Sequence, residues 1–112
     1  MFRLRILKVT GNSMHPTLES GAFVLVMGFV VNIKRLGVQW QPSLKVGDIV
    51  AVRHSQYGDI IKRICQIEYD DKRSITGLYL VGDNPSHSVS TEQMGLVEVE
   101  QVIGKVVWWV NG

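Results

Sequence analysis

The sequence predicts a mainly β fold, closed or partly closed, and three observations support this prediction. Apolar and polar residues alternate in several segments, a pattern typical of half-buried strands. Turn residues separate these segments, and helix signals are short and few. With 46% apolar residues among 112, the chain can bury one modest core. We therefore expect a single domain over residues 1–112.

Six segments are predicted as strands. Phe2, Leu4 and Ile6 alternate with two arginines, which predicts an amphipathic strand at the N-terminus. The next segment is rich in Val and Phe, and this composition predicts a buried strand. Two further strands flank a turn at residues 56–58 and predict a hairpin. The predicted strands span residues 2–6, 23–31, 48–54, 59–67, 75–81 and 99–110, the last as one long strand or two short ones.

Helical structure is predicted only as single turns. Ser90 begins a four-residue pattern typical of a capping box, and Gly95 is placed to end that turn. Residues 13–16 include a proline that the start of a helical turn tolerates, so a second short turn is predicted there. Residues 34–45, which contain both glycine and proline, are predicted as the main loop.

Charge and apolar runs limit the partners of the chain. Lys and Arg number 12 against 10 Asp and Glu, a net charge of +2 at pH 7, and the basic residues are mostly scattered. This distribution lacks the basic patch typical of nucleic-acid binding, so no nucleic-acid partner is expected. The longest apolar run, at residues 23–33, is shorter than the roughly 20 residues that cross a bilayer. We expect a protein that is cytoplasmic or peripheral to a membrane.

The single cysteine, Cys65, excludes an internal disulfide and fits a reducing compartment. Its apolar neighbours predict a buried side chain that acts as a small hydrophobe.

Two residues have the surroundings that hydrolysis by a serine nucleophile and a lysine base would need. Ser13 lies between a glycine and a proline in a tight turn, and such a turn would hold a nucleophile at one angle. Lys62 is predicted to share a strand face with Ile60 and Ile64. Loss of water disfavours the ammonium form and lowers the pKa of a lysine, and only the neutral amine accepts a proton. The simpler interpretations are a turn serine and a lysine that extends past the sheet edge.

Taken together with a third segment at residues 82–88, these features resemble the signal peptidase I family. The resemblance extends from Val9 to Val107 and depends on five ordered blocks. It implies a partly closed antiparallel β-barrel or coiled sheet of the signal peptidase and LexA C-terminal type, and a Ser/Lys-dyad endopeptidase that needs no cofactor or metal. The blocks are Gly-x-Ser-Met-x-Pro-Thr-Leu at 11–18, Gly-Asp-Ile-Val at 47–50, Lys62 with Arg63, Gly-Asp-Asn at 82–84 with Ser88, and Ile-Gly-Lys-Val at 103–106.

The resemblance implies a role for each matching residue. Ser13 looks like the nucleophile, and its backbone N–H like one donor of the oxyanion hole. Lys62 looks like the general base that takes the Ser13 proton and returns it to the leaving amine. Ser88 matches a serine whose hydroxyl orients the lysine. Substrate, oxyanion and loop support is implied for Gly11, Met14, Asp83 and Asn84.

Three departures from the family pattern favour a small soluble branch. Gly11 stands where bacterial signal peptidases often carry a serine that completes the oxyanion hole. The Asp and Arg that usually follow the second serine are absent after Ser88. We also expect no membrane anchor ahead of Ser13. The blocks are similar to those of the maturation proteases of nickel-type superoxide dismutase, which remove an N-terminal extension. The expected partner is a precursor polypeptide, with at most weak peripheral membrane contact.

Several alternatives remain open. A type I signal peptidase that lacks its membrane anchor fits the same blocks. A LexA-like self-cleaving protease shares the Ser–Lys chemistry, but the sequence has no Ala-Gly or Cys-Gly dipeptide. An inactive β module that binds peptides along a strand edge would explain the missing oxyanion serine.

Two other enzyme classes fit less well. In a Ser-His-Asp hydrolase, His15 would be too close to Ser13 along the turn to act as its base. A metal enzyme would need ligand spacing that His15, His54 and His87 lack. We expect each of these histidines at the surface or in a loop.

Overall fold

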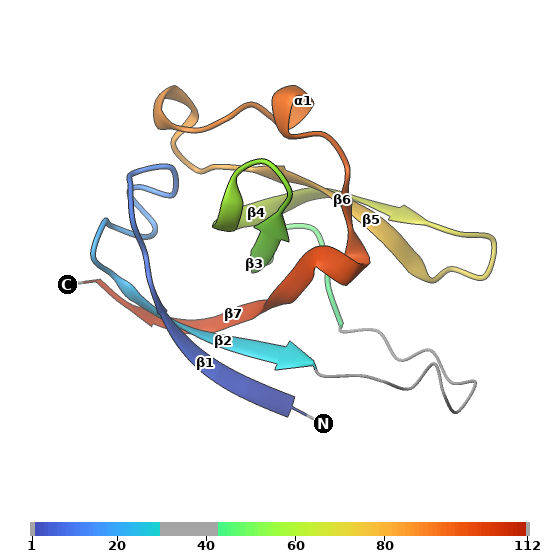
Figure 1. The fold of residues 1–112 in the computed structure, drawn as a ribbon, viewed down its shortest axis with the longest axis horizontal. Helices are drawn as coiled ribbons and strands as arrows, with labels where there is room; N and C mark the ends of the chain where they lie inside the picture. Colours follow the sequence, from blue (N-terminus) through green and yellow to red (C-terminus); the bar gives the residue numbers. More distant parts are fainter. Residues whose placement is uncertain (1, 30–42, 112) are drawn as a thin grey trace.

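One curved antiparallel sheet contains most of the chain that the computed structural model describes, residues 2–29 and 43–111 (Figure 1). Within this part, the strands are β1 (Phe2–Lys8), β2 (Phe23–Phe29), β3 (Ile49–His54), β4 (Gly58–Tyr69), β5 (Ile75–Val81), β6 (Val97–Glu98) and β7 (Val102–Val110). Their order in the sheet is β1-β2-β7-β3-β4-β5-β6. The mainly antiparallel β prediction is confirmed, and the sheet is open, with β1 and β6 at its edges.

Each of the six predicted segments contains a strand, whereas β6 lies outside all of them and was not predicted. The β3–β4 hairpin forms as predicted, with residues 55–57 in its turn. The segment predicted at residues 99–110 begins instead with a 3₁₀ turn, Val99–Gln101, and continues as β7. Residues 30–31 of the second predicted strand, and residues 34–42 of the predicted loop, lie outside the described residues.

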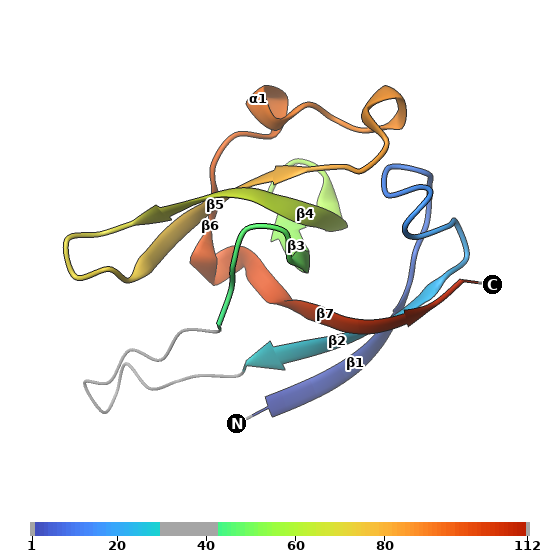
Figure 2. The ribbon, with the colours of Figure 1, turned by 180° about the vertical axis from the view of Figure 1, so that it is seen from behind.

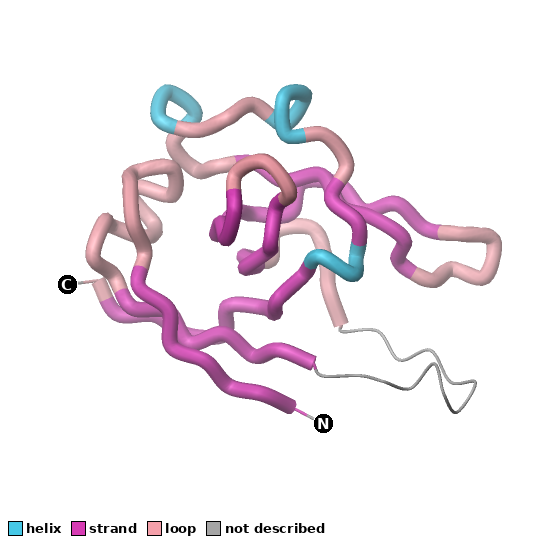
Figure 3. Tube along the Cα trace, viewed as in Figure 1, coloured by secondary structure: helices cyan, strands magenta, loops and turns pink. Residues whose placement is uncertain are grey.

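The connection between β5 and β6 contains two short helical turns (Figure 3). Ser90 caps the helix α1 (Thr91–Met94) by accepting a hydrogen bond from the backbone N–H of Gln93, and Gly95 ends it at φ 72°. Residues 13–17 also form a turn, as predicted. A 3₁₀ turn, Pro85–His87, precedes Ser88.

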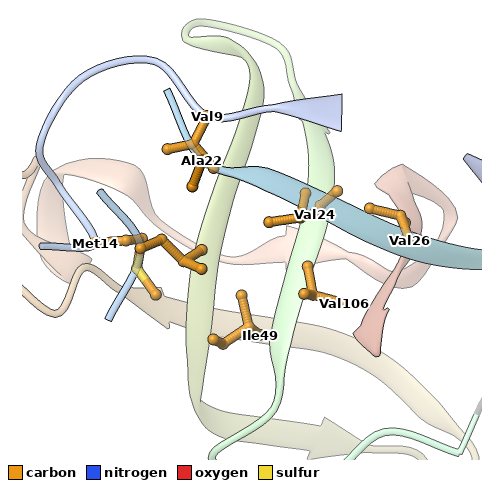
Figure 4. Close-up of a cluster of buried hydrophobic side chains, with 9 residues drawn as sticks. Val9, Met14, Ala22, Val24, Val26, Ile49 and Val106 are labelled. Carbon is orange, nitrogen blue, oxygen red and sulfur yellow. The ribbon is translucent and has the colours of Figure 1, made fainter. Parts of the chain in front are cut away.

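The core consists of two apolar clusters on either side of β3. Figure 4 shows the first cluster, in which Met14 from the loop after β1 packs with side chains from β2, β3 and β7. Burial of Met14 and Leu18 anchors this loop, because both side chains are almost fully removed from water. The second cluster packs β3, β4 and β5 against α1 and contains Leu44, Val50, Val52, Ile64, Ile75, Leu78, Leu80, Met94 and Val97.

β2 is buried on one face only, which corrects the prediction of a buried strand. Val24 and Val26 point into the first cluster, whereas the side chain of Phe23 is 50% exposed. Cross-strand pairing places the exposed side of β2 beside the exposed side chains of β1 and β7. We call this surface the outer face; its members are Leu4, Ile6, Phe23, Leu25, Met27, Trp108 and Val110.

Cys65 is exposed, so the prediction of a buried cysteine is wrong. Lys62 and Ile64 are buried on one face of β4, so the alternation of side chains places Cys65 on the opposite face. The β4–β5 register shifts between Ile64 and Gln66, which leaves Cys65 as an extra residue in β4. Its thiol donates to the carbonyl of Tyr79.

Candidate active site

Lys62 projects from the middle of β4 into an apolar environment. Its residue exposure is 5%, and its neighbour across the β3–β4 pair is the fully buried Val50. Ile60 and Ile64 pack in the second core cluster. Burial lowers the pKa of Lys62, because water no longer solvates the ammonium form. Lys62 has no carboxylate partner in the described part of the chain.

The ammonium of Lys62 has a hydroxyl partner instead. Its Nζ donates a hydrogen bond of 2.9 Å to Oγ of Ser88, which in turn donates to the carbonyl of Val89 at 3.3 Å. Ser88 follows the 3₁₀ turn, and its backbone N–H bonds the carbonyl of Pro85. A serine hydroxyl can orient an amine without neutralising its charge.

Ser13 lies in a turn whose main chain is bonded by Asn84. The side-chain amide of Asn84 donates to the carbonyl of Asn12 at 3.0 Å, and its backbone N–H donates to the carbonyl of Ser13 at 2.8 Å. Gly11 opens the turn at φ 79°, a conformation that favours glycine. Asn84 therefore joins the serine turn to the loop that carries Ser88.

Gly82 is the point where these segments come together. A Cβ at this position would overlap Oγ of Ser88 and lie 2.7 Å from the carbonyl oxygen of Ser13. Only glycine leaves room for both groups at this point.

The structure unites these residues only in part. Lys62 is bonded to Ser88, and the main chain of Ser13 lies against Gly82 and Asn84. Within the described residues, no hydrogen bond joins the hydroxyl of Ser13 to Nζ of Lys62. Catalytic hydrogen bonds are often long before substrate binds, so the lack of this bond does not contradict the roles predicted for Ser13 and Lys62. Both roles stay predictions.

Asp83 binds Arg63 in an ion pair that the sequence analysis did not identify. The carboxylate accepts hydrogen bonds of 2.8 and 2.7 Å from Arg63 and one of 2.7 Å from the hydroxyl of Thr17. These contacts hold the pKa of Asp83 below its usual range, with the Arg63 hydrogen bonds as the largest cause. Arg63 follows Lys62 on β4, and Thr17 belongs to the serine turn. The pair thus connects all three candidate segments, although the usual Asp and Arg after Ser88 are absent.

One of the three histidines differs from expectation. His15 and His87 are exposed, whereas His54 is buried at the end of β3. Its Nδ1 accepts hydrogen bonds from the backbone N–H groups of Gln56 and Tyr57, so Nε2 carries the proton and faces the carbonyl of Met94. His54 closes the β3–β4 turn, which explains its burial.

Among residues 2–29 and 43–111, no group of three or more His, Cys, Asp or Glu side chains is placed to bind a metal ion. The same residues include no helix with the length and apolar character that a membrane span requires.

A comparison with protein families gives a match over more than half of the chain. The family described as signal peptidase, peptidase S26, matches residues 1–73 of the 112. This segment contains Ser13 and Lys62 but ends before Asp83 and Ser88. No curated protein matches the chain.

Proposed function

Because the chain belongs to the signal peptidase family, peptidase S26, we propose that it is a serine endopeptidase with Ser13 as nucleophile and Lys62 as general base. The observation that supports this assignment best is the environment of Lys62. It is buried, its pKa is lowered, and it bonds to a neutral hydroxyl rather than a carboxylate. A lysine in this environment is far more often neutral than an exposed one, as a general base must be.

The proposed reaction proceeds through an acyl-enzyme. Neutral Nζ of Lys62 takes the proton of the Ser13 hydroxyl as Oγ attacks the scissile carbonyl carbon. The backbone N–H of Ser13 donates to the oxyanion, and the ammonium of Lys62 returns the proton to the leaving amine when the C–N bond breaks. Lys62 then takes a proton from the water that attacks the ester carbon, and it passes this proton to Oγ of Ser13 when the ester bond breaks, which restores both groups. Ser88 keeps Nζ oriented through both steps.

The proposed substrate is a precursor polypeptide that loses an N-terminal extension or signal sequence. The serine block at residues 11–18 and the Gly-Asp-Asn-Pro block at 82–85 support a nickel-type superoxide dismutase precursor as the candidate. Incubation of that precursor with the protein should give one new N-terminus, identified by mass spectrometry. An uncut precursor would overturn this substrate but not the protease assignment.

The protease assignment is tested with a mixed peptide library, with cleavage detected by mass spectrometry. Ser13→Ala should lose about three orders of magnitude or more in rate, because the nucleophile is removed. Ser20→Ala, an exposed serine in the same loop, is the matched control and should cleave as the wild type does. A wild type that cuts no peptide, or a Ser13→Ala variant with substantial activity, would contradict the proposal.

The competing proposal is an inactive module that binds peptides. The missing hydrogen bond between Ser13 and Lys62 and the lack of a side chain at Gly11 support it. It predicts peptide binding, measured by fluorescence anisotropy, with no cleavage by the wild type.

A further inference from the structure

The end of β7 contacts the serine turn through one side chain, that of Asn111. Figures 1 and 2 both show the C-terminal end of β7 beside the loop between β1 and β2. β7 pairs with the start of β2, where Val110 lies opposite Phe23, so the next residue extends past β2 and over the loop. Oδ1 of Asn111 accepts a hydrogen bond of 3.0 Å from the backbone N–H of Glu19, and Nδ2 donates one of 3.3 Å to the carbonyl of Thr17.

The side-chain carboxamide of Asn111 bonds the loop in the way that the backbone of a further paired residue would. A primary amide offers an N–H donor and a C=O acceptor, as a peptide group does, and here both bond the main chain of the loop. Its orientation is fixed by these partners, because only the oxygen can accept from the Glu19 N–H and only the nitrogen can donate to the Thr17 carbonyl.

The bonded residues, Thr17 and Glu19, follow the proposed nucleophile in the same loop between β1 and β2. Thr17 is held twice, by Asn111 at its carbonyl and by Asp83 at its hydroxyl. On its other side the turn is held by Asn84, which bonds the carbonyls of Asn12 and Ser13. The turn is therefore fixed from both sides, and Asn111 supplies the contact from β7.

We propose that Asn111 is a positioning residue that fixes the Ser13 turn for catalysis. This inference rests on the proposed function. Asn111 acts through the main chain of residues 17–19 and needs no contact with substrate. A small displacement of a nucleophile strongly lowers the rate of the chemical step. The affinity for substrate changes little, because most binding contacts lie away from the displaced atom.

The chain offers a matched control in Gln101, whose carboxamide also makes one bond of each kind to the main chain. Oε1 accepts from the Glu98 N–H at 2.9 Å, and Nε2 donates to the Arg53 carbonyl at 3.1 Å. Gln101 precedes β7 and lies at its other end, away from the serine turn. A purely structural role predicts the same consequences for Asn111→Ala and Gln101→Ala.

The experiment compares these two variants with the wild type on one peptide that the wild type cleaves. Asn111→Ala should lower kcat about tenfold or more and change KM by less than about threefold. Gln101→Ala should leave kcat within about twofold of the wild type. Amide hydrogen exchange, measured by NMR, should accelerate at Glu19 only in Asn111→Ala and at Glu98 only in Gln101→Ala.

Equal kcat in the two variants, or unchanged exchange at Glu19 in Asn111→Ala, would overturn the role of Asn111. Failure of the proposed function gives a different result. The wild type would then cleave no peptide, although hydrogen exchange at Glu19 would still accelerate in Asn111→Ala. This result would contradict the protease assignment and, with it, the catalytic role of Asn111.

Discussion

Two lysines lie on either side of the same residue in the sheet but have different side-chain partners. Val50 on β3 lies opposite Lys62 on β4 and opposite Lys105 on β7. Nζ of Lys105 lies 3.3 Å from the carboxylate of Asp48, and its side chain is 29% exposed. Nζ of Lys62 bonds the hydroxyl of Ser88 and is buried.

The difference shows how one sheet can hold a structural lysine and a candidate base side by side. A carboxylate stabilises the ammonium form, whereas burial beside a hydroxyl disfavours it. Asp48 also accepts the backbone N–H of Lys45, so the Lys105 pair belongs to a local turn. Lys62 has instead a partner that can orient the amine in either protonation state.

Replacement of each lysine by methionine should give the largest contrast. Lys62→Met should reduce peptide cleavage by about three orders of magnitude, since the amine proposed to take the Ser13 proton is removed. Lys105→Met should keep cleavage within about twofold and cost about 1 kcal/mol of stability, the range of a partly exposed ion pair. Steady-state kinetics and urea unfolding measure both. Equal activity losses would remove the distinction between the two lysines.

Removal of the hydroxyl partner should have the next largest effect. Ser88→Ala takes away the hydrogen bond that orients Nζ of Lys62, and we expect kcat to fall about 10- to 100-fold. Ser55→Ala, in the exposed β3–β4 turn, is the control and should behave as the wild type. A fully active Ser88→Ala variant would show that burial alone positions the lysine.

The Asp83–Arg63 pair should affect stability more than chemistry. The pKa of Asp83 is lowered in the folded protein, so its contribution is present at neutral pH and is lost as pH falls below about 4. Asp83→Asn should destabilise the protein by about 1 kcal/mol at pH 7, since both partners are partly exposed.

Urea unfolding at pH 7 and pH 3 provides the measurement for Asp83→Asn. The difference from the wild type should shrink at the lower pH. A difference that is independent of pH would mean that the carboxylate charge contributes nothing.

The cations of β1 extend the comparison and predict the smallest effect. β1 carries Arg3, Arg5 and Lys8 and no Asp or Glu, and none of the three makes an ion pair with a described residue. The outer face that β1 shares with β2 and β7 is largely apolar. Each cation near an anionic surface contributes about 1 kcal/mol, an attraction that salt screens. We expect weak sedimentation with phosphatidylserine vesicles at low salt, none at high salt, and peptide cleavage without lipid. Binding that persists in high salt, or activity that requires lipid, would contradict this expectation.

Local patterns predicted the strands, because alternation records which side of a segment meets the core. They did not reveal that one face of β2 is open, since composition does not say whether a second layer covers a strand. The exposure of Cys65 was missed for another reason. Its apolar neighbours in the sequence suggested burial, whereas the alternation that buries Lys62 and Ile64 places Cys65 on the opposite face.

The resemblance selected residues from distant segments, and the structure joins two of them, Lys62 and Ser88, by a hydrogen bond. The role of Ser13 stays a prediction. The contact of Arg63 with Asp83 spans 20 residues, and that of Asn111 with Glu19 spans 92. Neither has a local spacing that a pattern could identify. Both depend on how the strands pair, so they follow only from the fold.

The protonation of Lys62 is the central claim, and it can be measured directly. In protein with ¹³C-labelled lysine, the Cε signal of Lys62, assigned by its absence in Lys62→Met, is followed by NMR as pH rises. The account predicts a midpoint below the ordinary value of about 10.4, together with a cleavage rate that rises with pH along the same curve. A midpoint at or above that value, or a cleavage rate that does not follow the titration, would contradict Lys62 as the base.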